Sequence, residues 1–387
     1  MQMKKIRSEV LILIFGFLSA CGGAKPTLSF SALEADQELL FIEDKTKLFI
    51  MNSRGGDIEE IMSMGRAIQK PVWAPNGEAI AFFLMEEKDF DPFKSNMPSA
   101  DLVVLKLGGL EPDYLGKFDF SQAVDRHGWN YAQITQPVWH PDGEKIFVHD
   151  KNGLQLVIPD NKIIPLISNP NMHKLDIALS KANVVYCSGN ELFVYNFRTR
   201  KAVDIAGLRP TLRPLFNKKI EAVKFSPDEN SLAIASGKNV VLLDLKTLRG
   251  RIIHRAGEAV YDLAWNPNGE QLAILAGKFA SYASMGIGGS AGGKIPGNFS
   301  ISCVGIDGKK QHLLYRNKSF SDVRETSVAY SADGKWLTFL SATLSDPKPH
   351  IYIASTGGQG WAILKAGSKY SAHNWRPLKA VNSEKTK

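Results

Sequence analysis

Cysteine is scarce in this sequence: the 387 residues contain only three, Cys21, Cys187 and Cys303. Three cysteines cannot build a disulfide framework. Runs of positive charge are also missing outside the termini, because 47 Lys and Arg residues stand against 39 Asp and Glu residues and are spread along the chain. Nucleic-acid-binding proteins usually concentrate their positive charge in such runs. We therefore expect no nucleic-acid partner, and we expect Cys187 and Cys303 to be buried thiols.

Long apolar stretches are also missing after the N-terminus. Beyond residue 20, no apolar run approaches the roughly 20 residues that a membrane-spanning helix needs. The composition, with 44% hydrophobic residues, 33 Gly and 19 Pro, excludes intrinsic disorder, collagen and coiled coils. We therefore expect the bulk of the chain to fold as a soluble unit with a sizeable core.

Motifs for metal and cofactor chemistry are absent as well. There is no HExxH, no CxxC and no EF-hand loop, and the eight histidines lack ligand spacing. Residues 288–292 fit the G-x-S-x-G pattern around Ser290, but the Gly- and Pro-containing segment that follows cannot begin the helix that this pattern requires. We expect no catalytic residue, no cofactor and no metal site, and we interpret 286–293 as a Gly/Ser-rich loop.

The N-terminus has the order of an export signal. Three basic residues within 4–7 precede an apolar stretch at 10–18, which is too short for a membrane span. Residues 18–22, Leu-Ser-Ala-Cys-Gly, then resemble the lipobox of bacterial lipoproteins. The resemblance implies cleavage before Cys21 and acylation of that cysteine, which would anchor the protein to a membrane. The alternative is an ordinary signal peptide in which Cys21 is incidental.

One short motif recurs along the rest of the chain. An apolar strand ends in an aromatic residue and a Pro-Asp/Asn-Gly turn follows, as in the segment 72–77, Val-Trp-Ala-Pro-Asn-Gly. The aromatic residue, or leucine in one degenerate copy, stands at 73, 139, 179, 225, 265, 330 and 375. Three further short strands follow each copy, and four strands with a period of about 40 residues are the signature of a propeller blade. We interpret the aspartates of the turns and the motif tryptophans as structural.

The ends of the repeat region indicate how the ring closes. Three strand-like segments, 38–43, 47–52 and 57–62, precede the first motif, and one segment, 371–378, follows the last full unit. Three strands and one strand complete a further blade, so the sequence predicts an all-β, seven-bladed propeller closed by both chain ends. We expect the last strand to pair with the N-terminal set around 57–62 or its neighbours. Six blades with the N-terminal hairpins outside the ring is the alternative.

The predicted organisation has four parts. Residues 1–20 are the signal peptide, 21–37 the lipidated N-terminus and tether, 38–378 the propeller, and 379–387 a basic C-terminal tail. The repeats resemble the WD-like blades of the TolB propeller and of prolyl-oligopeptidase-type enzymes. The TolB family carries an α/β domain before a six-bladed ring and is not lipidated, so its partner-binding role does not transfer to this chain.

Strand parity within a blade predicts a working face. Turns between strands one and two and between strands three and four lie on one face, and all other connections lie on the opposite face. The long segments 86–100, 117–135, 277–299 and 341–349 all fall in the second set. Because function often resides in long loops on a rigid scaffold, we expect this face to bind a partner. Its candidate partner-binding residues are the aromatic side chains Phe90, Phe93, Trp129 and Tyr131.

These observations lead to one functional hypothesis and two alternatives. The hypothesis is an exported, membrane-anchored lipoprotein that acts as a non-enzymatic protein-interaction scaffold in the cell envelope. Its expected location is the outer membrane, facing the periplasm, where a monomer would bind envelope proteins of unknown identity. The alternatives are a propeller that binds a small molecule or glycan in its central channel, and a propeller enzyme. Copurification with an envelope complex would favour the hypothesis, and saturable binding of a small molecule would favour the first alternative.

Overall fold

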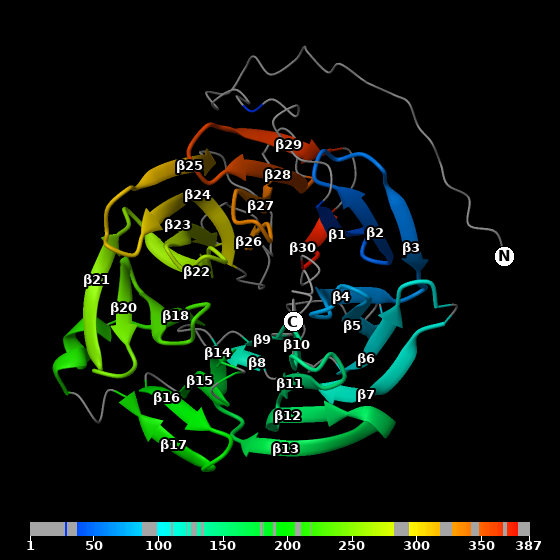
Figure 1. Ribbon diagram of the computed structural model, residues 1–387, viewed down its shortest axis with the longest axis horizontal. Helices are drawn as coiled ribbons and strands as arrows, with labels where there is room; N and C mark the ends of the chain where they lie inside the picture. Colours follow the sequence, from blue (N-terminus) through cyan, green and yellow to red (C-terminus); the bar gives the residue numbers. More distant parts are fainter. Residues whose placement is uncertain are drawn as a thin grey trace, which may run out of the picture.

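The apolar strands and Gly-containing turns of the repeat build seven four-stranded antiparallel sheets around a central axis (Figure 1). The computed structural model describes residues 28, 37–86, 99–109, 111–120, 122–124, 130–132, 135–178, 180, 182–188, 191–205, 210–216, 218–281, 294–317, 327–341, 348–366 and 370–377. Each sheet is one blade, and its first strand is the innermost. The predicted all-β, seven-bladed propeller is therefore confirmed.

The first four blades follow one another directly in the sequence. Blade 1 contains β4 (Ala67–Trp73), β5 (Ala79–Met85), β6 (Ser99–Lys106) and β7 (Asp113–Asp119). Blade 2 contains β10 (Val138–Trp139), β11 (Ile146–Asp150), β12 (Gly153–Ile158) and β13 (Lys162–Ser168). Blade 3 contains β14 (Met172–Ala178), β15 (Asn183–Ser188), β16 (Glu191–Asn196) and β17 (Lys201–Asp204). Blade 4 contains β18 (Ile220–Phe225), β19 (Ser231–Ser236), β20 (Asn239–Asp244) and β21 (Arg249–Arg255).

The last three blades complete the ring. Blade 5 contains β22 (Ala259–Trp265), β23 (Gln271–Ser281), β24 (Lys294–Gly305) and β25 (His312–Asn317). Blade 6 contains β26 (Val328–Tyr330), β27 (Trp336–Ser341), β28 (His350–Ser355) and β29 (Trp361–Lys365). Blade 7 contains β30 (Tyr370–Trp375), β1 (Glu38–Glu43), β2 (Lys47–Asn52) and β3 (Glu59–Ser63). The smaller elements are β8 (Gln122–Val124), β9 (Asn130–Ala132) and the 3₁₀ helices η3 (Pro159–Asn161) and η4 (Pro210–Phe216).

Blade 7 joins the two ends of the chain. Its strand order is β3-β2-β1-β30, with the C-terminal strand innermost. The last strand pairs with β1 through Leu39 opposite Trp375 and Phe41 opposite His373. It does not pair with the segment around 57–62, because β3 is the outer strand of the blade. The C-terminal strand therefore covers the edge of β1 that would otherwise be left unpaired.

The repeated turn has the geometry that its residues predict. In blade 1, the Gly77 amide donates to the Ala74 carbonyl, and Gly77 has a φ of 68°, in the region that favours glycine. The Asn76 side-chain oxygen accepts a hydrogen bond from the Glu78 amide at 3.0 Å. In blade 4, where the glycine is missing, Glu229 takes the corresponding position with a φ of 56°. The repeated turn therefore tolerates a strained residue when the rest of the motif is present.

The hydrophobic core lies between neighbouring blades. One cluster, for example, joins Phe83 and Phe118 of blade 1 to Trp139 and Ile146 of blade 2. Several motif aromatics also form hydrogen bonds across the blade boundary. The Trp139 indole donates to the Val72 carbonyl at 3.3 Å, and the Trp265 indole donates to the Lys224 carbonyl at 3.2 Å. Both acceptors directly precede the motif aromatic of the preceding blade, so the motif links blades as well as building them.

Two predicted loop insertions contain more strand than the sequence pattern indicated. Within 277–299, β23 and β24 extend as a paired hairpin whose partners include Phe279 opposite Pro296 and Ser281 opposite Lys294. Within 117–135, the hairpin of β8 and β9 forms a separate two-stranded sheet. Small alternating segments of this kind are hard to distinguish from loops because they carry few apolar residues.

Candidate functional site

The predicted site residues lie almost entirely outside the described part of the chain. Cys21, Phe90, Phe93 and Trp129 belong to segments outside the described residues. Tyr131 lies in β9, where its backbone pairs with Ala123 of β8. The lipidation of Cys21 and the binding role of the four aromatic residues therefore stay predictions.

Strand order determines the two faces of the ring. Because adjacent antiparallel strands run in opposite directions, the turns between the first two and the last two strands of each blade share one face, which we name the short-turn face. Connections between second and third strands, and those between blades, share the opposite face, which we name the long-loop face. The strand ends that flank 86–98, 120–137 and 342–349 lie on the long-loop face, as do the end of β23 and the beginning of β24. The strand ends beside the predicted binding loops therefore share one side of the ring.

Both chain ends leave from the other side. The end of β30 and the beginning of β1 occupy the position of a turn between a first and a second strand, so they lie on the short-turn face. Upstream of β1, the Leu28 amide donates to the Trp361 carbonyl at 3.2 Å, and Leu28 packs against the cluster between blades 6 and 7. Trp361 is the first residue of β29, directly after a short turn. Residue 28 is thus held next to the short-turn face.

The aspartates of the repeated turns are structural, as the sequence analysis expected. Asp142 accepts hydrogen bonds from the Glu144 amide at 2.9 Å and the Lys145 amide at 3.2 Å. Although partial burial opposes the shift, these bonds and the Lys145 side chain hold the pKa of Asp142 well below its usual range. Asp228 and Asp333 accept the equivalent amide hydrogen bonds, at 3.1 Å and 3.0 Å. Hydrogen bonding within the turn accounts for these carboxylates without a catalytic role.

The innermost strands of blades 3, 4 and 5 bring a set of charged side chains together. Lys224 Nζ lies 3.6 Å from Asp176 Oδ1, and the charges of Asp176 and Asp262 raise the pKa of Lys224. Asp176 Oδ2 also accepts a hydrogen bond from the Phe225 amide of the next blade at 2.7 Å. Burial raises the pKa of Asp262, and the nearby Lys224 and Lys174 oppose that shift. The Lys224–Asp176 ion pair and the hydrogen bond from the Phe225 amide therefore link blade 3 to blade 4.

The two cysteines of the propeller are buried and not bonded to each other. Burial raises the pKa of Cys187 to about 12 and that of Cys303 to about 11. Such thiols carry little thiolate at neutral pH and are poor nucleophiles and metal ligands. Among the described residues, no group of three or more His, Cys, Asp or Glu side chains is arranged to hold a metal ion. The G-x-S-x-G segment around Ser290 lies outside the described residues.

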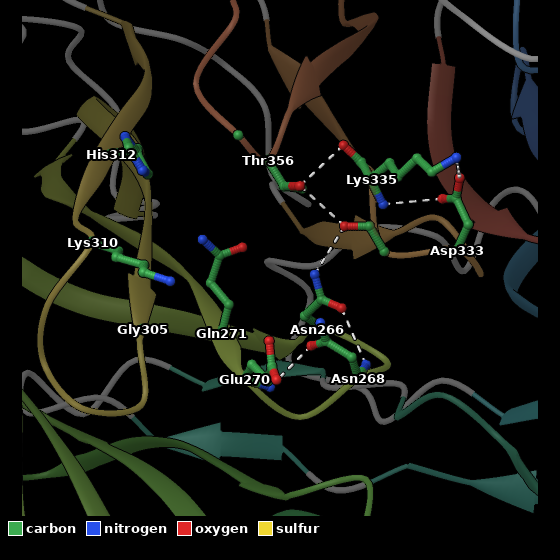
Figure 2. A pocket seen from close by; sticks show the side chains of 12 residues that line it. Asn266, Asn268, Glu270, Gln271, Gly305, Lys310, His312, Asp333, Lys335 and Thr356 are labelled. Carbon is green, nitrogen blue, oxygen red and sulfur yellow. Dashed lines mark hydrogen bonds and ion pairs between the residues drawn. The ribbon is translucent and has the colours of Figure 1, made fainter.

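A polar pocket of about 400 Å³ opens between blades 5 and 6 on the short-turn face (Figure 2). Figure 2 shows Lys310 and His312 of blade 5 on one wall and Thr356 and Lys335 of blade 6 on the other, with Gln271 between them. The pocket is lined by residues of four turns and the strand ends beside them: Asn266, Asn268, Glu270, Gln271, Gly305, Lys310, His312, Asp333, Gly334, Lys335, Thr356 and Gly357.

Hydrogen bonds across the blade boundary fix the floor of the pocket. Asn266 Nδ2 donates to the Gly334 carbonyl at 2.9 Å, and the Thr356 hydroxyl donates to the same carbonyl at 3.0 Å. Lys335 Nζ lies 3.6 Å from Asp333 Oδ2. Burial opposes the shift, but the Ser331 hydroxyl and the Lys335 amide lower the pKa of Asp333 by hydrogen bonding, so this carboxyl is charged at neutral pH. Lysines and carboxylates balance in the lining, which suits an uncharged polar ligand.

No sequence pattern predicts this pocket. Its residues come from four turns between Asn266 and Gly357, and no local motif connects them. One signal was present: the residue after the motif tryptophan, alanine in blade 1, is Asn266 in blade 5. An amide at that position reaches the next blade, and only the ring geometry makes this apparent.

Comparisons with known proteins agree with this geometry. The sequence matches no family model and no curated protein. A candidate 6-phosphogluconolactonase from Bacteroides uniformis shares 10% identity, with 88% of this chain and 100% of that chain covered and a TM-score of 0.55. TolB from Acinetobacter baumannii shares 12% identity, with 89% of this chain and 68% of that chain covered and a TM-score of 0.50.

The chain is a seven-bladed β-propeller similar in fold to TolB. At 10–12% identity the likeness extends to the fold alone, because propellers host unrelated functions. No helix among the described residues is long and apolar enough to cross a membrane. The function of the propeller must therefore be argued from its own faces and pocket.

Proposed function

We propose that this propeller is an exported, lipid-anchored scaffold that binds a protein partner in the cell envelope without catalysing a reaction. Its expected location is the outer membrane on the periplasmic side, as a monomer. The observation that carries the proposal is the division between the two faces: the long connections share one side of the ring, and the chain ends leave from the other. A tether on the short-turn side would leave the long-loop face free for a partner.

The chemistry of the long-loop segments supports a protein partner. Phe90, Phe93, Trp129 and Tyr131 belong to connections on that face, and aromatic side chains are enriched among the residues that dominate protein interfaces. Two kinds of reactive group in the described propeller also support a non-enzymatic role. Burial raises the pKa of the Cys187 and Cys303 thiols, and the turn aspartate Asp142 accepts a hydrogen bond within its own turn, so each group is explained by its place in the fold.

The anchor is tested by mass. We expect the mature protein to begin at Cys21 and to carry acyl chains, and Cys21→Ala to release the protein from membranes or leave it unprocessed. Fractionation shows whether each chain is in the membranes, and intact-protein mass spectrometry of the membrane fraction gives the first residue and the acyl chains of the mature protein. An unmodified Cys21 in membrane-associated protein would rule out the anchor.

The binding face is tested by capture of a partner from envelope extracts. Replacing Phe90, Phe93, Trp129 and Tyr131 with Ser is expected to reduce capture at least tenfold, because hot-spot aromatics each contribute about 2 kcal/mol or more. The matched control is Gln359→Ser on the short-turn face, and both variants must melt like the wild type. Loss of capture in the control but not in the aromatic variant would contradict the proposed face.

The pocket of Figure 2 favours a second candidate function, binding of a small uncharged glycan. Its amide, hydroxyl, amino and carboxylate groups can hydrogen-bond sugar hydroxyls, and its volume of about 400 Å³ is within the range of ligand pockets. Isothermal titration with N-acetylglucosamine oligomers tests it. Saturable binding that Gln271→Ala abolishes would support it, and absence of heat with the wild type would dismiss it for this glycan class.

A further inference from the structure

Three consecutive blades carry an excess of basic side chains on their outer short turns. The segments concerned are the turns between the third and fourth strands, together with the first residues of the fourth strands. Eight exposed cationic side chains lie there, and we name them the basic arc: Arg198, Arg200 and Lys201 in blade 3, Lys246, Arg249 and Arg251 in blade 4, and Lys309 and Lys310 in blade 5.

Few carboxylates accompany the basic arc. Asp244, at the end of β20, accepts hydrogen bonds from the Thr247 amide at 2.6 Å and the Thr247 hydroxyl at 2.7 Å. Asp307 accepts one from the Lys309 amide at 2.8 Å. The corresponding segments of the other four blades have no such excess: they hold Glu111 and Asp113, Asp160 and Lys162, no charged residue in blade 6, and Arg54, Asp57, Glu59 and Glu60 in blade 7. Among these outer short turns, the excess of positive charge is therefore confined to blades 3, 4 and 5.

The basic arc spans three neighbouring blades at the outer edge of the ring. Its strands β17, β21 and β25 are the outer strands of consecutive blades (Figure 1). Arg251 Nη2 donates to the Ile306 carbonyl at 2.5 Å, which joins blade 4 to the turn that carries Lys309 and Lys310. An extended anionic surface could therefore contact several of these side chains at once.

The basic arc lies on the side to which the N-terminal segment is held. The Leu28 amide bonds to Trp361 at the edge of blade 6, which is next to blade 5. Seven peptide steps separate Cys21 from Leu28, and they span at most about 25 Å when fully extended. An acyl group on Cys21 would therefore keep the membrane close to the short-turn face.

We propose that the basic arc binds the anionic phospholipid headgroups of the membrane that holds the protein, and so turns the long-loop face away from that membrane. This inference deepens the proposed function and rests on its lipid anchor. Polybasic surfaces bind anionic leaflets through electrostatic attraction that acts within about one Debye length, roughly 8–10 Å at physiological salt. Acyl chains already supply a firm attachment, so the arc determines orientation.

The experiment uses a chain that begins at Gly22, which lacks the acylated cysteine and retains every described residue. Sedimentation with phosphatidylglycerol–phosphatidylcholine vesicles and with pure phosphatidylcholine vesicles measures binding. The arc variant combines Arg198→Gln, Arg200→Gln, Lys246→Gln, Lys309→Gln and Lys310→Gln. The control variant removes the same charge from the long-loop face through Lys45→Gln, Lys151→Gln, Lys218→Gln, Lys219→Gln and Lys238→Gln.

We expect the wild type and the control to bind the anionic vesicles only, and the arc variant to bind them at least tenfold more weakly, with all three chains melting alike. High salt is expected to abolish the binding. Equal losses in the two variants, no preference for anionic vesicles, or equally tight binding of double-stranded DNA would each overturn the proposal. Because this chain lacks Cys21, the outcome is independent of whether that cysteine is acylated.

Discussion

Arg376 shows how one side chain connects distant parts of the ring. Its Nε donates to the Gly77 carbonyl at 2.8 Å, and its guanidinium lies 5.0 Å from the centre of the Trp73 ring. It also forms an ion pair with Glu38, whose carbonyl accepts the Arg376 amide at 2.9 Å. The side chain therefore joins the C-terminal strand to β1 and to blade 1. Residue 376 follows the last motif aromatic, but the sequence pattern could not identify a partner 299 residues away.

We expect Arg376→Ala to lower the free energy of unfolding by about 2 kcal/mol, because it removes a charge-assisted hydrogen bond and a cation–π contact. Arg376→Lys should lower the free energy of unfolding by less, since lysine keeps a cation near Trp73 although it lacks the planar guanidinium. Urea denaturation measures both, with exposed Arg255→Ala as the control. A variant as stable as the control would show that closure does not depend on this side chain.

Two buried histidines make stability depend on pH. Burial lowers the pKa of His149 in β11 to about 4, although the nearby Asp150 opposes that shift, and burial lowers the pKa of His373 in β30 to about 4. Unfolded histidine titrates near 6.5, so below that pH the unfolded chain binds protons that the native chain does not. This contribution to stability is complete above pH 6.5 and is lost as the pH falls toward 4.

We therefore expect the melting temperature to fall steadily between pH 7 and pH 4, with each histidine costing up to about 3 kcal/mol. Calorimetry of the wild type and of the double variant His149→Gln, His373→Gln measures the slope. The double variant should show a shallower slope even if it melts at a lower temperature at pH 7. An unchanged slope would assign the pH dependence to other groups.

At the scale of the element, the last strand completes a blade that begins with the first. β30 covers one edge of β1, and its Tyr370 and Trp375 join the cluster that includes Leu39 and Phe41. The Trp375 indole also donates to the Thr338 hydroxyl of blade 6 at 2.9 Å. The strand therefore contributes to the blade and to the boundary with its neighbour.

Deleting residues 370–387 is expected to lower the melting temperature by about 10 °C or more, or to prevent folding, because it unpairs β1 and exposes its apolar side chains. Deleting 379–387 alone, the predicted basic tail, should leave the melting temperature unchanged. Circular dichroism during heating compares the two chains with the full chain. Equal melting of all three would show that ring closure contributes little.

The strands were predictable and several connections were not. The motif aromatic and its turn recur in the sequence, so the ends of the first strands could be predicted, as at Trp73, Trp139, Trp265 and Trp375. The number of copies of this motif also predicted the number of blades. The pocket and the basic arc are assembled from turns in different blades, so no window of sequence contains them. The hairpin of β8 and β9 was missed because six residues carry too little alternation.

At the scale of the whole molecule, the two faces carry connections of different length. Strand parity, which needs only the number of strands in a blade, assigns the long connections to one face and the chain ends to the other. The basic arc lies on the face of the chain ends. A protein anchored from that side would present the long-loop face, with the predicted contacts Phe90, Phe93, Trp129 and Tyr131, to its surroundings.

Site-specific photo-crosslinking in intact cells tests this account most directly. A photoreactive residue is placed at Lys94 in the long-loop segment 86–98 or at Gln359 on the short-turn face, and adducts are identified by mass spectrometry. The account predicts a discrete protein adduct from position 94, and none with a protein from position 359. A protein adduct from position 359 together with none from position 94 would contradict it.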